Sequence, residues 1–544
     1  MHLVSQSAYS SYRKPTKADI SANAEFEAYL DKIEPLATSE EVQARKVVLS
    51  DIQKIINKWV QEASAKQGFT GESLKMACGK VFTFGSFRLG LITPASDIDA
   101  LCVAPKHISR EDFFGTLLPI LESNPFVTEI SGVPDAVVPI IKMKYKGIEV
   151  DLTFARLNLA VVDSKLESLA SDNLLKHLDE KTVRSINGTR VADAMLALVP
   201  NQASYITVLR FVRHWAKQRG LYSNAMGFFG GITWAILSAR VCQMYPYFTP
   251  LQLAQKFFLV FSRWNWSSPV TLCPITQSSE VGLMGFKVWN PKINASDRFH
   301  LMPIVTPAFP CMNSTYNVTE TTRRIITAEL ARAHDLLVVD ASEESLTKIC
   351  RSPAFLSLFN YFFVIDVFCQ NEAAFSKLKG FVESRIRLLL KFLESPASGV
   401  QASRPWPKEI ELPTETGKFR TVWVVGLSFP PARAGGSVAD LRPAISSFHE
   451  KLNDWNEKSN YVEGQDFSVR LFHTSRTSEF VQTLEEATGG KLHNSAVAEY
   501  LERVNAEVRE AAGAGGSWSL AQAVEEPNKK RKLDLEVQLE DLVA

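Results

Sequence analysis

The stretch 82-FTFGSFRLGLITPASDIDALCVAP-105 decides how the fold of this chain is interpreted. It places a Gly-Ser turn after a strand-like segment and then two aspartates separated by one residue. Because alternate side chains of a strand share a face, Asp97 and Asp99 are expected to point the same way, while Ile98 and Ala100 enter a core. Two carboxylates at close range resist ionising beside each other, and a divalent cation relieves that conflict. The stretch therefore predicts a metal site beside a turn that has free backbone N–H groups.

A second alternating segment, 148-IEVDLTFA-155, supplies a third carboxylate. Its apolar residues alternate with Glu149, Asp151 and Thr153, which predicts a strand with one apolar and one polar face. If this strand lies beside the first, Asp151 reaches the same metal ions. Oxygen ligands on a rigid strand suit Mg²⁺, and a two-metal site activates an attacking hydroxyl and neutralises a leaving pyrophosphate.

Each of these features also has a simpler interpretation. Two aspartates separated by one residue are often a solvated turn, and Gly85 with Ser86 can be a plain connection between a strand and a helix. Glycine nevertheless lets the backbone approach a phosphate closely, and the N–H groups of the turn with the Ser86 hydroxyl can bind its oxygens. The turn, the paired aspartates and Asp151 together favour a site that holds metal and phosphate.

The composition is that of an ordinary soluble globular protein. The 544 residues correspond to about three domains, and 46% of them are hydrophobic and 22% charged. The net charge of +1 gives no global indication of a polyanionic partner, so such a partner would be held by local basic patches. The seven cysteines are scattered and never spaced as CxxC, which predicts reduced thiols and no structural zinc. No segment has the pattern of a secretory signal or a membrane span, so we expect no membrane partner.

The hydropathy pattern predicts alternating blocks of strands and helices. A capping box at Thr38–Glu41 begins a long helix after an N-terminal arm with one short helix. Later come helices from about 160 to 260, an irregular Pro- and Asn-rich connection at 267–318, and helix again at 319–350. A second α/β pattern follows, and the chain after about 505 is expected to be disordered. The predicted strands are 81–84, 97–104, 137–145, 148–155, 359–369, 420–429 and 466–473, and the predicted helices include 204–221, 230–245, 372–394 and 439–457.

The quoted residues carry a resemblance to a known family. The pattern FGSFRLGL…SDIDAL…EVDLTFA resembles the nucleotidyltransferase superfamily, and more closely the eukaryotic nuclear poly(A) polymerases. A Gly-Ser turn with two aspartates would mark only the superfamily, whereas a similarity over roughly residues 15–480 indicates the narrower family. It runs through 187-NGTRVADAMLALVPN-201, 208–246, 257–266, 288–318, 379–394 and 421–429.

The resemblance implies an α+β multidomain fold. A nucleotidyltransferase catalytic domain with a mixed sheet is followed by a helical central domain, an RRM-like C-terminal α/β domain and a disordered tail. The expected division is 1–45 for an N-terminal arm and helix that belong to the central domain, 46–160 for the catalytic domain, 161–345 for the helical central domain, 346–500 for the RRM-like RNA-binding domain and 501–544 for the tail.

The activity implied by the resemblance is template-independent transfer of AMP from ATP to the 3′-OH of RNA, with release of pyrophosphate. In the family this polynucleotide adenylyltransferase reaction uses two Mg²⁺ or Mn²⁺ ions and serves mRNA polyadenylation. Asp97, Asp99 and Asp151 match the catalytic, metal-binding carboxylates.

Further residues match positions around the ATP in the resembling family. One group belongs to the turn, one to the helical domain and one to a later loop. Phe84, Gly85, Ser86 and Thr93 surround the incoming nucleotide, Asn187 lies near the base or sugar, Arg213 and Lys217 face the triphosphate, Tyr222 stacks on adenine, Asn224 makes a polar contact, Gly231 and Ile232 belong to the closing loop, and Thr306 lies beside the base.

Two positions depart from the usual family pattern. Arg213 stands where lysine is usual; its charge can still meet phosphate, and its fork can bind it bidentately. Phe87 replaces the more usual tyrosine and removes a hydroxyl from the turn. Tyr222 and Trp215 also fit an ordinary core stripe, and Lys217 with Arg219 fits a solvated helix face.

The sequence further suggests how RNA and partners are recognised. The region 346–500 lacks the aromatic signature of a true RRM, so Lys and Arg contacts to the phosphates of the RNA 3′ end are expected. The run 528-NKKRKLD-534 fits a nuclear localisation signal, and a chance basic cluster is the alternative. The family docks onto the cleavage and polyadenylation machinery, and a monomer is the default expectation. Adenine choice requires either hydrogen bonds that a wrong base leaves unpaired or a domain closure that only ATP completes. Closure is the favoured hypothesis, with 225-AMGFFGG-231 as a moving part.

Two other functions remain open. A terminal uridylyltransferase or a CCA-adding enzyme would share the Gly-Ser turn and the aspartates, but would not be expected to share the long middle similarity. An inactive RNA-binding scaffold on the same fold is a candidate of a different class, and the intact aspartates argue against it.

Overall fold

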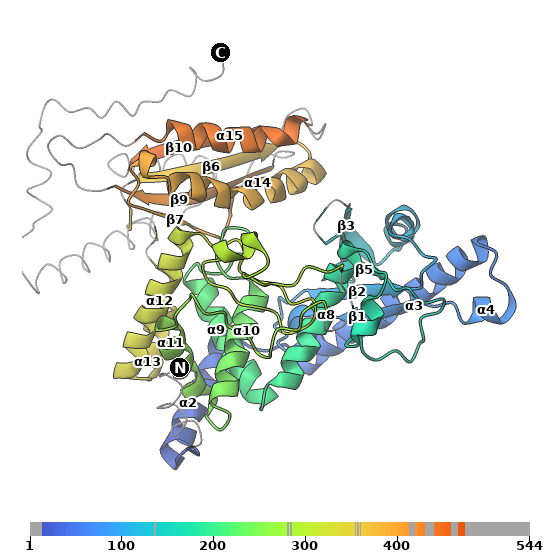
Figure 1. Ribbon diagram of the computed structural model, residues 1–544, viewed down its shortest axis with the longest axis horizontal. Helices are drawn as coiled ribbons and strands as arrows, with labels where there is room; N and C mark the ends of the chain where they lie inside the picture. The colour runs from blue at the N-terminus through green and yellow to red at the C-terminus, as the bar shows by residue number, and fades with distance from the viewer. Residues whose placement is uncertain are drawn as a thin grey trace, which may run out of the picture.

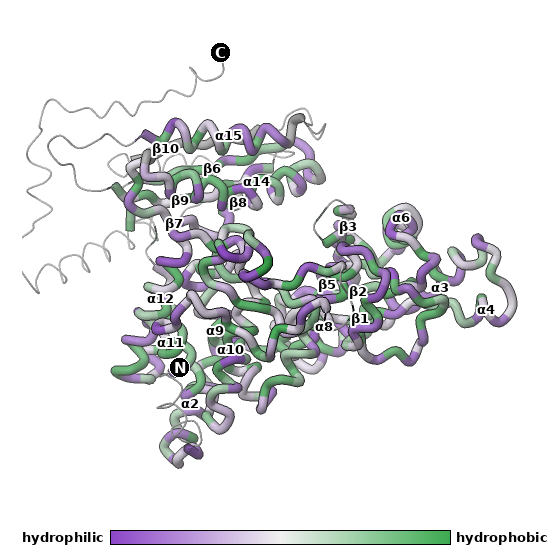
Figure 2. Tube along the Cα trace, viewed as in Figure 1, coloured by the Kyte–Doolittle hydropathy of each residue, from purple (hydrophilic) through white to green (hydrophobic). Residues whose placement is uncertain are grey.

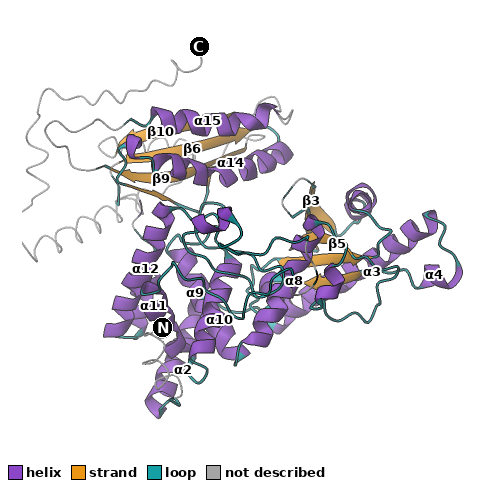
Figure 3. Cartoon of the chain, viewed as in Figure 1, coloured by secondary structure: helices purple, strands orange, loops and turns teal. Residues whose placement is uncertain are grey.

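The computed structural model describes residues 13–134, 136, 138–279, 282, 285–353, 355, 358–359, 361–412, 419–429, 440–457 and 466–473. Three regions follow one another in space (Figure 1): a mixed sheet with its helices, a bundle of helices, and a second sheet covered by two helices. The strands gather in two separate sheets with the helical region between them (Figure 3).

The first sheet is mixed, as the family resemblance implies. Its order is β1-β2-β5-β4-β3, and only the central pair β2 and β5 is parallel. Ile98 and Ala100 of β2 are fully buried, which confirms the face assigned to them. Strand β3 is not among the predicted strands, because its sequence alternates poorly and its pairing with β4 is interrupted by an irregularity. The strands are β1 (Lys80–Thr83), β2 (Ile98–Ala104), β3 (Val127–Val133), β4 (Ile140–Tyr145) and β5 (Ile148–Arg156).

Helix α3 (Ser39–Lys66) packs against this sheet. It begins with the predicted capping box, since Thr38 accepts from the N–H of Glu41 and Glu41 accepts from the N–H of Thr38. Its apolar face, including Ile52 and Trp59, shares one core cluster with the buried strand residues. The shorter helices of the region are α4 (Gly71–Lys75), α5 (Gly85–Arg88), α6 (Arg110–Asp112), a π turn (Phe113–Leu117) and α7 (Leu118–Glu122).

The helical region contains a large aromatic core. The ring of Trp215 is fully buried and lies 5.6 Å from that of Trp234, so this position of the predicted stripe belongs to the core. The ring of Trp266 stacks on that of Phe261, so Trp266 also belongs to this core. The N-terminal helix has 17 residues and is longer than the short helix predicted. The helices are α2 (Lys17–Ile33), a 3-10 turn (Asp172–Leu175), α8 (Glu180–Leu198), α9 (Gln202–Gln218), α10 (Gly231–Met244), α11 (Pro250–Ser262), a 3-10 turn (Ala295–Phe299), α12 (Glu320–Val339) and α13 (Glu343–Cys350).

The C-terminal region has the βαββαβ topology of RRM-like domains, with the short strand β8 added between β7 and β9. Its antiparallel sheet runs β10-β6-β9-β7, with β8 also paired to β9. Helices α14 and α15 alternate between hydrophilic and hydrophobic residues, as expected of helices that cover a sheet (Figure 2). The short strands β7 and β8 are not among the predicted strands. The elements are β6 (Tyr361–Cys369), α14 (Glu372–Leu393), a 3-10 turn (Pro396–Ser398), β7 (Ala402–Pro405), β8 (Ile410–Leu412), β9 (Phe419–Ser428), α15 (Arg442–Glu457) and β10 (Asp466–His473).

Several sequence expectations concern the chain as a whole. All seven cysteines are free thiols, as predicted. Within the described ranges, no helix combines the length and apolarity needed to cross a membrane. The predicted disordered tail and the basic run 528–534 lie outside the described residues.

Candidate active site

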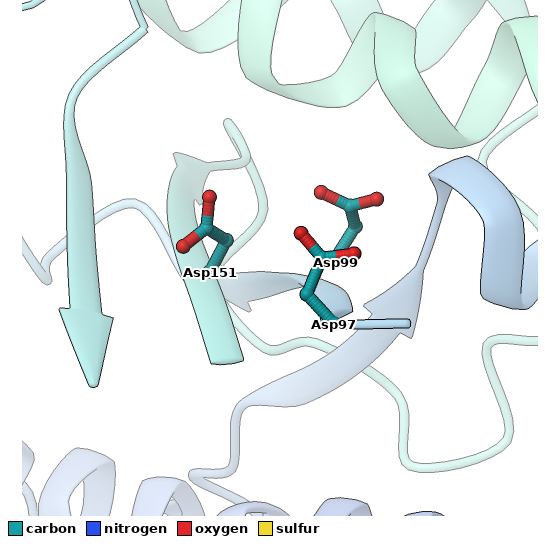
Figure 4. A group of neighbouring side chains, drawn as sticks. All are labelled: Asp97, Asp99 and Asp151. Atoms are coloured by element: carbon teal, nitrogen blue, oxygen red, sulfur yellow. The ribbon is translucent and has the colours of Figure 1, made fainter. Parts of the chain in front are cut away.

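The parallel pairing of β2 and β5 brings the predicted carboxylates together. Asp99 lies directly opposite Asp151 in the register, and Asp97 comes one residue before β2 begins. One carboxylate oxygen from each of the three lies within 4.8 Å of the other two. Figure 4 shows Asp97 and Asp99 close together, with Asp151 on the neighbouring strand. Asp97 was expected within the strand, but it lies just outside it, and its carboxylate still joins the group.

Gly85 makes room for one of these carboxylates. Its φ of +59° lies in the left-handed region, and a Cβ at this position would be 1.9 Å from Oδ2 of Asp99. The preceding residue, Phe84, donates its N–H to the carbonyl oxygen of Asp99 at 3.0 Å. The turn expected to approach a phosphate therefore approaches the Asp99 carboxylate first, and a glycine is required for that reason alone.

A buried arginine holds the loop that leads into Asp97. The Arg45 guanidinium, which belongs to α3, donates to the carbonyl oxygens of Thr93, Pro94 and Ser96. Thr93 and Ser96 also share a hydrogen bond between their hydroxyls at 2.9 Å. The predicted site residue Thr93 is thus part of a fixed turn. Arg45 was missed because nothing in its helical sequence context distinguishes it from a surface cation.

The aspartates strain one another electrostatically. Burial, and then the charges of Asp97 and Asp151, raise the pKa of Asp99 to about 7. Burial also raises the pKa of Asp151, although Lys142 opposes this shift with its Nζ 3.2 Å from Oδ2. Asp99 and Asp151 therefore resist ionising in the protein without a cation. Oxygen donors in this arrangement fit a divalent ion of the Mg²⁺ or Mn²⁺ type, so the trio could hold one.

Lys142 is a residue of the site that the sequence analysis missed. It lies opposite Asp151 in the antiparallel pair of β4 and β5. A signal for it exists, because the tight turn at Lys146 and Gly147 fixes the register of the two predicted strands. The ion pair shows that Asp151 has a cation partner even without metal.

Helix α9 brings two of the predicted cations to the same side. The charge of Arg213 lowers the pKa of Asp99, and the charge of Asp97 acts on Lys217. Desolvation by the surrounding residues, followed by the Arg213 charge, lowers the pKa of Lys217. Its Nζ lies 5.7 Å from the ring centroid of Tyr222. Arg213, Lys217 and Tyr222 therefore lie near one another. Arg219 is buried, so it does not belong to a solvated helix face.

The segment after α9 forms a compact turn around Tyr222. Tyr222 and Phe229 form an isolated β-bridge, and the hydroxyl of Tyr222 would be 2.5 Å from a Cβ on Gly231. Oδ1 of Asn224 is buried without a hydrogen-bond partner, and its carbonyl accepts from Asn317 at 3.0 Å. Ile232, at the start of α10, is 37% exposed. Four of the predicted nucleotide residues thus lie in one short structure.

In the part of the chain that the structure describes, the side chains of the remaining predicted residues form no hydrogen bond with the aspartate trio. Asn187 of α8 has a buried Oδ1 without a partner, and the ring of Phe84 lies against the neighbouring Gly188. Thr306 accepts from and donates to the backbone of Met312, which closes a loop. Within the described ranges, neither Ser86 nor Thr306 is hydrogen-bonded to an aspartate of the trio.

A mixed sheet that presents three clustered aspartates beside a Gly-Ser turn defines a nucleotidyltransferase. Three consecutive family models match this chain: the poly(A) polymerase nucleotidyltransferase domain at 10–199, the poly(A) polymerase central domain at 204–349 and the "Poly(A) polymerase predicted RNA binding domain" at 354–420. The chain belongs to the poly(A) polymerase family.

Curated relatives are similar over most of the chain. It is 36% identical over 475 residues to a "Poly(A) polymerase" of Dictyostelium discoideum, which covers 86% of this chain and 58% of the relative. It is 39% identical over 461 residues to the "Nuclear poly(A) polymerase 1" of Arabidopsis thaliana, with coverages of 84% and 63%. The chain thus spans less than two thirds of these relatives.

Among solved structures, similarity extends to a cytoplasmic RNA terminal U-transferase. The sequence identity is 15% and the TM-score is 0.42, over 61% of this chain and 98% of the other. Because the TM-score is below 0.5, this similarity has no weight in the functional assignment.

Replacing Gly85 with alanine should weaken divalent-metal binding. The new Cβ would collide with the Asp99 carboxylate and push it out of place. Mutation of a residue that positions a metal ligand typically lowers metal affinity by about 10- to 100-fold. Titration with Mn²⁺, followed by electron paramagnetic resonance, measures this. Gly68→Ala is the matched control, because Gly68 also has a positive φ, of +88°, and a Cβ added there would meet no atom within 4 Å. Equal losses in both variants would contradict the expectation.

The raised pKa of Asp99 predicts a pH-dependent cost in the metal-free protein. The folded state holds the Asp99 proton up to about pH 7, whereas an unfolded aspartate ionises near its usual value of 3.8, so this group's contribution to stability is lost as the pH rises through that window. Asp99→Asn should therefore raise the Tm in EDTA by a few degrees at pH 8, and the difference should shrink towards pH 4. A variant that is less stable than the wild type at pH 8 would disprove the shift.

Proposed function

We propose that the protein is a template-independent polynucleotide adenylyltransferase that adds AMP from ATP to RNA 3′-OH ends and releases pyrophosphate, as in mRNA polyadenylation. The carrying observation is the trio Asp97, Asp99 and Asp151, held on a nucleotidyltransferase sheet in a chain of the poly(A) polymerase family. Two Mg²⁺ or Mn²⁺ ions bound there would lower the pKa of the attacking hydroxyl and neutralise the leaving pyrophosphate.

The residues around the trio have complementary tasks. Lys142 neutralises Asp151 in the metal-free protein and is freed when a cation takes its place. The backbone N–H groups of Gly85 and Ser86, with the Ser86 hydroxyl, bind phosphate oxygens. Phe84 and Thr93 hold the two ends of the loop 84–93 in place through their hydrogen bonds to Asp99 and Ser96. Arg213 and Lys217 meet the triphosphate from α9, where the Arg213 fork replaces the usual lysine.

Adenine is bound by the turn that follows α9. Tyr222 stacks on the base, and the unpaired Oδ1 of Asn224 accepts from a base amino group. A base without a donor at that point leaves the buried oxygen unsatisfied, which penalises it. Closure of the turn 225–231 over ATP remains part of the proposal. Asn187, Gly231, Ile232 and Thr306 complete the pocket around the sugar and base.

The rest of the chain serves the RNA substrate. The RRM-like region contacts the phosphates of the RNA 3′ end through Lys and Arg, so binding weakens with salt. The protein acts as a monomer in the nucleus, where it associates with the cleavage and polyadenylation machinery. Its domains have the boundaries that the Sequence analysis gives. Relatives named as nuclear poly(A) polymerases support the location.

Extension of a labelled RNA tests this function. The wild type, Asp99→Ala and Asp51→Ala are each incubated with RNA ending in adenosines and with one of ATP, UTP, CTP or GTP and Mg²⁺. Long products are expected with ATP only, at background level in Asp99→Ala and at the wild-type level in Asp51→Ala. Asp51 is a suitable control because its partners are the surface residues Lys54 and Lys146.

Other products would redirect the assignment. Extension with UTP, or a stop after a few nucleotides, would keep the scaffold and replace the substrate with that of a uridylyltransferase or CCA-adding enzyme. Absence of any extension in both Mg²⁺ and Mn²⁺ would refute the enzymatic function in favour of an RNA-binding scaffold.

A further inference from the structure

A buried ionic cluster joins the helical region to the C-terminal sheet. Its single carboxylate, Glu329 of α12, is 6% exposed and accepts hydrogen bonds from three guanidinium groups. Arg219 binds it in a fork at 2.8 and 2.7 Å, Arg332 at 3.0 Å, and Arg404 of β7 at 3.4 Å. Burial alone would raise the pKa of Glu329, but the Arg219 hydrogen bond and the three charges hold it below its usual value. The cluster is therefore ionised and joins α9, α12 and β7.

The C-terminal sheet also contacts the end of α9 directly. Arg404 donates to the carbonyl oxygen of Arg219 at 2.9 Å. The ring of Trp406 lies against the next residue, Gly220, where a Cβ would be 2.6 Å from the ring. Gly220 has a φ of +66°, and the N–H of Leu221 returns to the carbonyl of Ala216, which is how glycine ends a helix. Two residues of the C-terminal region thus fix the last turn of α9.

This last turn lies between two residues of the proposed ATP site. Arg404 and Trp406 contact Arg219 and Gly220. Lys217 lies two residues before Arg219, and Tyr222 lies two residues after Gly220. Their contact, with Nζ 5.7 Å from the ring centroid, spans the same helix end. In Figure 1 strand β7 lies on the side of the C-terminal sheet that faces α12 and the helical region. A shift at Gly220 would therefore be transmitted to both residues.

We infer that Arg404 and Trp406 are positioning residues for the ATP site, acting through the end of α9 that carries Lys217 and Tyr222. The inference rests on the proposed function. It assigns the C-terminal region a second task beside RNA contact, because its docking sets the geometry with which ATP is held. By linkage, a ligand that alters this docking alters ATP affinity, and ATP alters the affinity for that ligand by the same factor.

Direct nucleotide binding tests the inference. The probe is a non-hydrolysable ATP analogue with Mg²⁺, titrated by calorimetry into the full chain below the Tm of every variant. Arg404→Met and Trp406→Leu should bind it about 2- to 30-fold more weakly than the wild type, the range typical of coupling through packed side chains. KM for ATP should rise by a larger factor than kcat falls. Arg404→Met keeps the fork Arg219–Glu329, so the carboxylate is not left unpaired.

The matched control is Arg420→Met. Arg420 lies on β9 of the same sheet and pairs with Asp366 at 2.9 Å, but it has no part in the cluster around Glu329. Its replacement should leave the affinity for the ATP analogue unchanged. A double-mutant cycle tests whether the effect of Arg404 on the affinity for the ATP analogue passes through Tyr222. In a Tyr222→Leu background, Arg404→Met should lower this affinity much less than it does in the wild type.

The outcomes separate the two proposals. A lower Tm with unchanged ATP affinity and KM in both Arg404→Met and Trp406→Leu would overturn the inference and leave a purely structural fastening. Additive effects in this cycle and in the same cycle on a Lys217→Met background would also overturn it, because the action would then pass through neither residue at the end of α9. If Arg404→Met does not fold, Arg404→Lys and Trp406→Leu decide the question. A wild type that binds no analogue and extends no RNA would refute the proposed function, and the inference with it.

Discussion

Mutual repulsion among three aspartates is the constraint around which the catalytic sheet is built. The register of two parallel strands forces Asp99 and Asp151 side by side, and a glycine with a positive φ lets the chain pass close to one of them. Strand geometry directs both side chains to the same face of the sheet, where each is only partly exposed. The fold thus stores an unfavourable arrangement of charge that a divalent cation makes favourable. Stability of the metal-free protein and readiness to bind metal are opposite consequences of one geometry.

Several positively charged residues surround the three aspartates. Lys142 supplies one positive charge from the neighbouring strand, and Arg45 fixes the loop that enters Asp97 without touching a carboxylate. On the opposite side, α9 contributes Arg213 and Lys217. The cations come from three different elements, so the positive field at the site depends on the catalytic and helical regions being packed together. A chain with almost balanced overall charge thus still gathers positive side chains around its aspartate group.

Much of the fold and the aspartate group could be predicted from the sequence, because each rests on local periodicity. Alternation predicts β2 and β5, a capping box predicts the start of α3, and the apolar runs of the C-terminal region predict β6, α14, β9, α15 and β10 but not the short strands β7 and β8. Lys142 was also within reach, since the turn at Gly147 sets the register of its hairpin. Arg45 and the cluster around Glu329 were not, because their partners are distant in the chain and no periodic pattern records them. Strand β3 was missed because its own sequence is weakly patterned and its neighbour determines it.

The parallel pairing of β2 and β5 has a consequence for how the protein comes into being. Parallel neighbours cannot be joined by a tight turn, so the chain must lay down α6, α7, β3 and β4 before β5 can return beside β2. The Thr153 hydroxyl meets the Ala100 carbonyl across 53 residues of sequence. During synthesis, the helix α3 and the first aspartates leave the ribosome well before the residue that completes their group. Contacts this far apart in the chain form late, because the intervening loop must be closed first. The nascent protein therefore carries an incomplete aspartate group until β5 pairs with β2, and the three carboxylates come together only when the sheet closes.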